Sequence, residues 1–175
     1  MGSDADAVNL ALLVLRVALG LTIIAHGYNH AWGGGKIEGT AGWFASMGLR
    51  PGRVHALAAT ATELAAGAAL VVGFLNPLAC AGVVGVMVVA WITAHRTNGF
   101  FIFKPGQGWE YVMMLTVVAV VLATIGPGEW SLDDALGIDW YGWSGMLTAA
   151  VLGGGGAALL LAVAWRPDPP TDGDG

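Results

Sequence analysis

Charged residues are scarce in this chain, and their scarcity excludes most classes of water-soluble protein. Lysine, arginine, aspartate and glutamate together make up 11 % of the 175 residues, whereas a soluble domain usually carries about a quarter. Hydrophobic residues make up 56 %. Too few charges remain to cover a globule in water, which excludes an ordinary cytosolic enzyme and a disordered chain. The net charge of −5 also excludes nucleic acid as a partner, because nucleic-acid binding needs a basic face.

Cysteine is almost absent as well. Cys80 is the single cysteine, and it lies inside an apolar run. One thiol can form neither a disulfide within the chain nor a CxxC pair, so dithiol redox chemistry inside the protein is excluded. Covalent haem attachment through two cysteines is excluded for the same reason.

Long apolar runs dominate what is present. A helix that spans a membrane needs about 20 mostly apolar residues, and five runs approach this length: 8–26, 57–75, 78–94, 109–126 and 144–165. We therefore predict an all-α, polytopic transmembrane helix bundle in a cell membrane. The Pro-, Asp- and Gly-rich tail 167–175 is expected to be disordered.

The distribution of basic residues predicts the orientation of these spans. With five spans, every basic residue outside them falls on one side of the membrane: Lys36, Arg50, Arg53, Arg96, Lys104 and Arg166. Because basic loops stay on the cytoplasmic side, we expect the N-terminus outside and the C-terminus in the cytoplasm.

Two short interfacial helices are predicted in the connecting loops. The first covers 40–49 and carries Trp43, Phe44 and Met47 on one face. The second opens at Ser131, which stands three residues before Asp134 in a pattern that resembles a capping box. Four consecutive glycines, 153–156, lie within the last span and indicate either close helix packing or a hinge.

Two ionisable residues, Arg16 and Glu63, lie inside predicted spans. Such residues are functional candidates by default, because a charge at membrane depth is costly. Both are followed four residues later by a glycine, Gly20 and Gly67, which would let the two helices approach closely. We therefore expect a buried Arg16–Glu63 charge pair, which either holds helix register or orients a polar ligand.

Further polar residues converge on the predicted cytoplasmic end of the bundle. They form a candidate polar pocket made of His26, His30, His55, His95 and Glu110. Histidines and carboxylates can bind a metal or manage protons for a quinone, and histidine is also common at a membrane interface for its polarity alone. No cofactor is predicted from a motif. A quinone remains an open alternative, and a bound metal is disfavoured.

An ordered set of motifs resembles the DoxX family of small bacterial membrane proteins. The motifs cover residues 10–137, which makes 1–137 a DoxX-like membrane domain and 138–166 an additional transmembrane segment. In this sequence they are Arg16-x-x-x-Gly20, His26-Gly27-Tyr28-Asn29-His30, Gly39 to Phe44, Glu63-Leu64-x-x-Gly67, Asn98-Gly99-Phe100-Phe101, Trp109-Glu110-Tyr111 and Gly126 to Asp133.

The resemblance implies a four-helix membrane core, from which this chain departs by its fifth span. It also departs at His30, where family members often have lysine. Relatives are associated with a terminal oxidase, with thiosulfate:quinone oxidoreduction and with scaffolding of oxidative-stress enzymes. The motif positions include Arg16, His26, Glu63 and Glu110.

Three functions follow as hypotheses. The first is a non-catalytic membrane subunit of a larger redox or envelope complex, with membrane or cytoplasmic subunits as partners. The second is a membrane component of a quinone-linked oxidoreductase, in which His26, Glu63 and Glu110 manage protons. The third is a small-molecule transporter, a hypothesis that an inverted repeat in the sequence would support.

Overall fold

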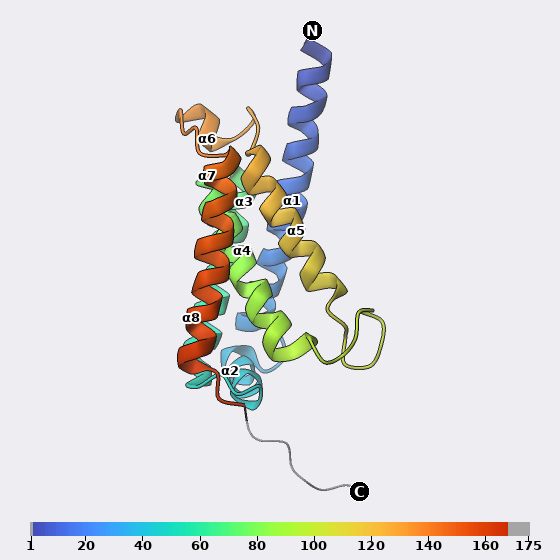
Figure 1. Ribbon diagram of the computed structural model, residues 1–175, viewed down its shortest axis with the longest axis vertical. Helices are drawn as coiled ribbons and strands as arrows, with labels where there is room; N and C mark the ends of the chain where they lie inside the picture. The colour runs from blue at the N-terminus through green and yellow to red at the C-terminus, as the bar shows by residue number, and fades with distance from the viewer. Residues whose placement is uncertain (1, 168–175) are drawn as a thin grey trace, which may run out of the picture.

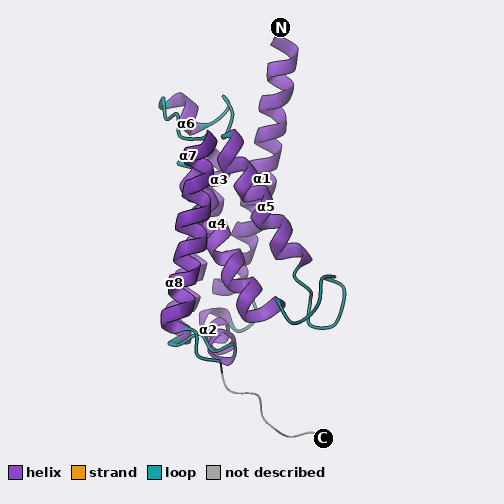
Figure 2. Cartoon of the chain, viewed as in Figure 1, coloured by secondary structure: helices purple, strands orange, loops and turns teal. Residues whose placement is uncertain are grey.

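The chain folds as an all-α bundle in the computed structural model, which describes residues 2–167 (Figure 2). The predicted fold class is confirmed: within these residues no strand forms, and the only β-type pairing is an isolated bridge between Leu49 and Trp165. Residues 168–175, most of the predicted tail, lie outside the described part. In chain order the elements are α1 (Gly2–Trp32), α2 (Lys36–Ser46), α3 (Gly52–Val72), α4 (Asn76–Ala90), η1 (Trp91–His95), α5 (Glu110–Ile125), α6 (Leu132–Ala135), α7 (Gly142–Thr148), η2 (Ala149–Gly154) and α8 (Gly155–Ala164).

Among the described residues, four helical rods are long and apolar enough to cross a membrane. They are Asp4–Trp32, Gly52–Val72, Asn76–His95 and Gly142–Ala164, and the last two run on through the π-helical turns η1 and η2. The remaining predicted span, 109–126, is α5, which has 16 residues, or about 24 Å at the helical rise. It packs against α4, and in Figure 1 it ends well short of the level at which α8 ends and α2 lies.

The bundle has two distinct ends. The α2 end holds α2 and the loop 96–109, and the α6 end holds α6 and the α3–α4 turn (Figure 1). Residues 4–8 of α1 are exposed and project beyond the α6 end. Large apolar side chains cover the outer surface, for example Leu159 and Val163, each 67 % exposed. Such a surface suits lipid and not water, so the protein is a multi-pass membrane protein.

Two glycines set a close contact between α1 and α3. A Cβ on Gly20 of α1 would lie 2.7 Å from the carbonyl oxygen of Gly67 on α3, and a Cβ on Gly67 would lie 2.6 Å from that of Gly20. The predicted close approach of these two helices is therefore confirmed, and it places Gly20 directly opposite Gly67 on antiparallel helices.

The two surface helices differ from prediction only in their bounds. α2 begins at Lys36, four residues before the predicted start, because the Gly33–Gly35 turn ends there and nothing in the next residues interrupts a helix. In α6 the predicted N-cap forms, since the hydroxyl of Ser131 accepts a hydrogen bond from the backbone N–H of Asp134 at 3.2 Å.

Candidate functional site

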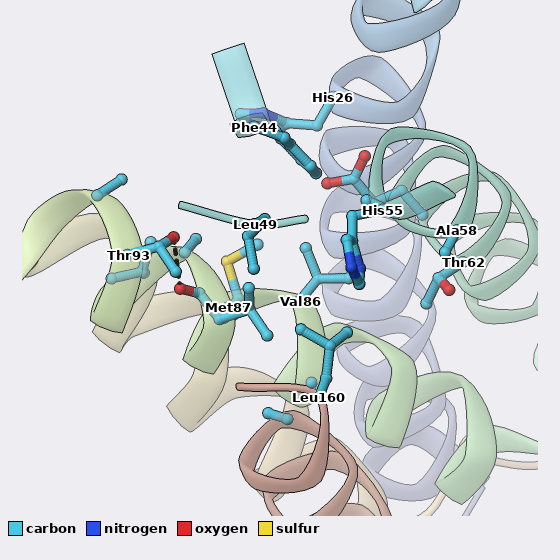
Figure 3. A pocket seen from close by; sticks show the side chains of 18 of the residues that line it. His26, Phe44, Leu49, His55, Ala58, Thr62, Val86, Met87, Thr93 and Leu160 are labelled. Atoms are coloured by element: carbon cyan, nitrogen blue, oxygen red, sulfur yellow. Dashed lines mark hydrogen bonds between the residues drawn. The ribbon is translucent and has the colours of Figure 1, made fainter. Parts of the chain in front are cut away.

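A cavity of about 650 Å³ lies at the α2 end of the bundle (Figure 3). Its walls come from α1, α2, α3, α4 with η1, the start of α5, and η2 with α8. Side chains such as Met87 and Val86 of α4, Leu49 and Leu160 make most of the lining apolar (Figure 3). The volume lies in the range of small-molecule sites, about 300–1,000 Å³. We refer to it as the α2-end cavity.

All four histidines of the chain line the α2-end cavity, together with Glu63. His26 and His30 come from the last turns of α1, which continues to Trp32 and so keeps both on one face. His55 comes from the first turn of α3 and His95 from the end of η1. Four residues of the predicted polar pocket thus surround one space, although they are far apart in sequence.

Glu110, the fifth member of the predicted pocket, lies outside the cavity lining. Its carboxylate accepts a hydrogen bond from the backbone N–H of Ile102 at 3.0 Å. The side chain therefore orders the loop 96–109 from the first turn of α5. Among the described residues, no group of three or more His, Cys, Asp or Glu side chains is arranged to hold a metal ion.

The first polar pair in the cavity joins α1 to α3. Nδ1 of His30 lies 2.9 Å from Oε2 of Glu63, and the two side chains are 13 % and 3 % exposed. Thr40 of α2 donates a hydrogen bond to the backbone carbonyl of His30 at 2.9 Å. The ring of Phe44 packs edge-on against the imidazole. α2 therefore covers this pair and holds the end of α1 in place.

The second polar pair joins α1 to α5. Nε2 of His26 lies 3.1 Å from the hydroxyl of Tyr111, which is in the first turn of α5. Tyr111 is not among the site residues that the sequence predicts. The motif Trp109-Glu110-Tyr111 contains it, but the sequence position of a residue in the first turn of a helix does not indicate which neighbouring helix its side chain faces.

His95 is fixed by the loop that follows it. Its Nδ1 lies 2.7 Å from the backbone carbonyl of Gln107. A carbonyl can only accept, so Nδ1 carries the proton, and Nε2 of the neutral ring is left as an acceptor. His55 is held less tightly, with Nε2 3.4 Å from the carbonyl of Arg50. Figure 3 shows the His55 ring in the middle of the cavity.

Arg16 is buried as predicted but does not pair with Glu63. Its Nη1 donates to the backbone carbonyls of Leu70 at 3.2 Å and Val71 at 2.6 Å, and its Nη2 donates to that of Trp130. These acceptors sit at the α6 end of the bundle. Arg16 therefore lies far from the α2-end cavity.

The helix register explains why the expected pair is not formed. With Gly20 opposite Gly67, Arg16 faces Val71, and Glu63 lies eight residues, or about 12 Å, nearer the α2 end. The helix ends do not account for the difference, because α1 continues six residues past the predicted boundary and α3 begins five residues earlier, and these two changes nearly cancel. Arg16 and Glu63 each precede their glycine by four residues, so on antiparallel helices they fall on opposite sides of the glycine contact. The carbonyls of the last turn of α3 have no partners within the helix, so a cation binds there favourably.

Asp133 performs the matching role for α4. Its carboxylate accepts hydrogen bonds from the backbone N–H groups of Leu75, at 2.7 Å, and Asn76, at 2.9 Å. A carboxylate at a helix N-terminus is favourable for the same electrostatic reason. Its own N–H donates to the carbonyl of Gly73 at 2.9 Å. Arg16 and Asp133 thus hold the α3–α4 turn, and we call them the α6-end lock.

The comparison with known families agrees with this architecture. Residues 11–96 match the model of the DoxX family. The match covers most of α1 and all of α2, α3, α4 and η1, and leaves out α5 and the Gly142–Ala164 rod. No curated protein and no solved structure matches the chain. The matched segment builds four of the walls of the α2-end cavity, and over this segment, residues 11–96, the chain belongs to the DoxX family of membrane proteins.

Proposed function

We propose that the protein is the membrane component of a quinone-linked oxidoreductase complex in a bacterial membrane, and that the α2-end cavity binds the quinone ring. One observation carries the proposal. An apolar cavity between membrane-spanning helices has two polar pairs on its wall, His30 with Glu63 and His26 with Tyr111. Most of the remaining lining is apolar or aromatic, for example Trp43 and Phe44. The other polar side chains in it are His55, Thr62, Thr93, His95 and Gln107.

The chemistry of a quinone suits this distribution of polar groups. A quinone ring is flat and apolar on its faces and carries two carbonyl oxygens on opposite edges. Reduction of the ring takes two electrons and two protons and yields a hydroquinone. The hydroxyl of Tyr111 and the imidazole of His30 can donate hydrogen bonds to the carbonyl oxygens. His30 and Glu63 can also deliver a proton, since imidazole gains and loses one near neutral pH. A partner oxidoreductase supplies the electrons.

A binding titration tests this proposal. Quinones quench tryptophan fluorescence, and Trp43 lines the cavity, so the difference between the protein and its Trp43→Phe variant reports occupancy. The protein in lipid nanodiscs is titrated with a short-tailed benzoquinone. We expect Glu63→Gln and Tyr111→Phe to weaken binding at least tenfold. Glu38→Gln is the matched control, because Glu38 forms an exposed ion pair with Arg53 at 2.9 Å.

Equal binding by all these variants would refute the proposed site, and so would an absence of binding to the unmodified protein. The electron donor is sought separately. Membranes from cells that lack the protein are compared with membranes that carry Glu63→Gln, and the rate of quinone reduction is measured.

We propose that the α2 end faces the cytoplasm, so that the N-terminus lies outside. All six basic residues outside α1 belong to segments at this end, which supports the proposal. A Lys104→Cys variant in a Cys80→Ala background tests it. A membrane-impermeant maleimide should label this cysteine in inverted vesicles and not in intact cells.

The loop 96–109 favours a second candidate function, that of an accessory subunit that docks a partner. Four consecutive apolar residues are exposed on it, Phe100, Phe101, Ile102 and Phe103, the last by 78 %. Exposed apolar patches of this kind mark interaction surfaces. Native purification in mild detergent tests the idea. We expect a partner that co-purifies in fixed ratio and is lost from Phe103→Asp, whereas a lone chain or a homo-oligomer would contradict it.

A further inference from the structure

The α2-end cavity has an apolar limb that runs away from the histidines toward the middle of the membrane. The limb lies between α3 and the η2–α8 rod, with α4 as its floor. It is lined by Ala58, Ala59 and Thr62 of α3, by Ala81, Gly82 and Gly85 of α4, and by Leu152, Gly153, Gly156 and Leu160 of η2 and α8. From Leu160 to Leu152 it extends eight residues along the rod, or about 12 Å.

Small residues create this limb, and one glycine marks where it opens. At Gly153 the rod packs tightly on α4, since a Cβ there would lie 2.6 Å from the carbonyl oxygen of Ala81. Three residues further on, a Cβ at Gly156 would meet no atom within 4 Å. The rod therefore contacts α4 closely at Gly153. At Gly156 the absence of a side chain leaves the limb of the cavity unfilled.

The rim of the limb is exposed on the lipid-facing surface of the bundle. α3 and α8 both pack against α4 and have almost no contact with each other. On the two sides of the rim, Ala58 and Gly156 are exposed, and Leu152 is 54 % exposed. Figure 3 shows Ala58 and Thr62 of α3 on one side and Leu160 of α8 on another side of the cavity. The limb is thus accessible from the hydrocarbon layer of the membrane.

The α2 end of the limb is closed by the chain itself. After α8 the backbone pairs with the loop that follows α2: the N–H of Arg50 donates to the carbonyl of Ala164 at 3.0 Å, and that of Arg166 donates to Gly48 at 2.7 Å. The indole N–H of Trp165 donates to the carbonyl of Met47 at 2.9 Å. A ligand therefore reaches this limb more easily from the membrane than from the aqueous side.

We propose that this limb binds the isoprenoid tail of a membrane quinone, and that the rod Gly142–Ala164 is the element that confers tail binding. The inference rests on the proposed function, because the quinone ring occupies the histidine-lined part of the same cavity. The shape supports a linear apolar chain: a narrow apolar limb leads from a polar pocket to the lipid-facing surface. The rod lies outside the segment that matches the DoxX family model, so this wall is added to the matched part.

Two glycine variants test the tail site. Gly156→Leu fills the limb, whereas Gly155→Leu is a matched control, because a Cβ at Gly155 also meets nothing within 4 Å and Gly155 does not line the cavity. Thr62→Leu fills the limb independently from α3. Three probes are titrated in nanodiscs by quenching or competition at Trp43: a quinone with an isoprenoid tail, the same ring without a tail, and a ring-free isoprenoid alcohol.

We expect the tailed quinone to bind the unmodified protein at least tenfold more tightly than the tail-free ring. Gly156→Leu and Thr62→Leu should abolish this advantage and leave binding of the tail-free ring within twofold, while Gly155→Leu should behave as the unmodified protein. A tail advantage that survives both limb-filling variants overturns the inference, and so does equal binding of the two quinones by the unmodified protein.

The three probes separate failure of this inference from failure of the proposed function. If the tail-free ring does not bind but the tailed quinone does, and if the isoprenoid alcohol displaces that quinone and Gly156→Leu abolishes its binding, the ring site fails and the tail site stands. Mass spectrometry of the lipid that co-purifies with the protein distinguishes the source of the chain. A quinone supports the inference, and a phospholipid acyl chain in its place overturns it.

Discussion

Replacement of Arg16 by methionine should destabilise the protein strongly without acting on the α2-end cavity. Methionine keeps the length and apolar stem of the side chain but removes the three hydrogen bonds to Leu70, Val71 and Trp130. It also removes the positive charge at the C-terminus of α3. Asp133, 1 % exposed, would then remain as a carboxylate at the neighbouring helix terminus without the nearby cation.

The size of the effect follows from these losses. Three hydrogen bonds to a charged donor, at about 1.5–3 kcal/mol each, give roughly 5–9 kcal/mol before any relaxation. Part of this is offset, because the desolvation cost of the guanidinium disappears together with its bonds. Removing one side of a buried charged network costs about 3–5 kcal/mol in other proteins. We therefore expect the free energy of unfolding to fall by about 3–5 kcal/mol.

Unfolding in mixed micelles of detergent and SDS, followed by tryptophan fluorescence, measures this change. Arg16→Lys is the matched control, because it keeps the charge and loses the planar guanidinium group. Its free energy of unfolding should lie between those of the unmodified protein and Arg16→Met. In a double variant, Arg16→Met with Asp133→Asn, the free energy of unfolding should fall by less than the sum of the falls in the two single variants, because the two residues hold the same turn. Quinone binding at Trp43, measured on the folded fraction, should change by less than twofold.

If Arg16→Met unfolded at the same SDS fraction as the unmodified protein, the stabilising role of Arg16 in the α6-end lock would be refuted. It would also be refuted if this variant kept its stability and lost ligand binding, because Arg16 would then belong to the site and not to the α6-end lock.

Three further predictions concern the fold. Gly20→Val should destabilise the protein by about 1–3 kcal/mol, because the added side chain overpacks against Gly67, and SDS unfolding measures this. Gly39→Ala, at an exposed position of α2, should have little effect. Ser131→Ala should cost about 1 kcal/mol, because the N-cap of α6 is lost; an unchanged unfolding midpoint would contradict this. Cys80 is 0 % exposed, so it should resist maleimide labelling in folded protein and react fully in SDS, and labelling of the folded protein would show that the core of α4 opens.

The α2-end cavity illustrates how much of a site sequence can anticipate. His26 and His30 are four residues apart, so one helix brings them together, and a sequence pattern records that spacing. The orientation rule for basic loops placed His55 and His95 at the same end. Neither the helical spacing nor the orientation rule predicts Tyr111 as a site residue. Its contact with His26 depends on how α5 packs against α1, and that packing is set by contacts along the whole bundle.

Hydropathy and composition determined by themselves that this chain is an all-helical membrane bundle, because the bilayer imposes its length and polarity on every span. Local chemistry determined the N-cap at Ser131 and the close approach of Gly20 to Gly67. Tertiary structure alone decided the partners of the buried charges. The antiparallel packing of Gly20 on Gly67 places Arg16 and Glu63 on opposite sides of that contact, and the side chains then bind what lies within reach: helix carbonyls for Arg16, and His30 for Glu63.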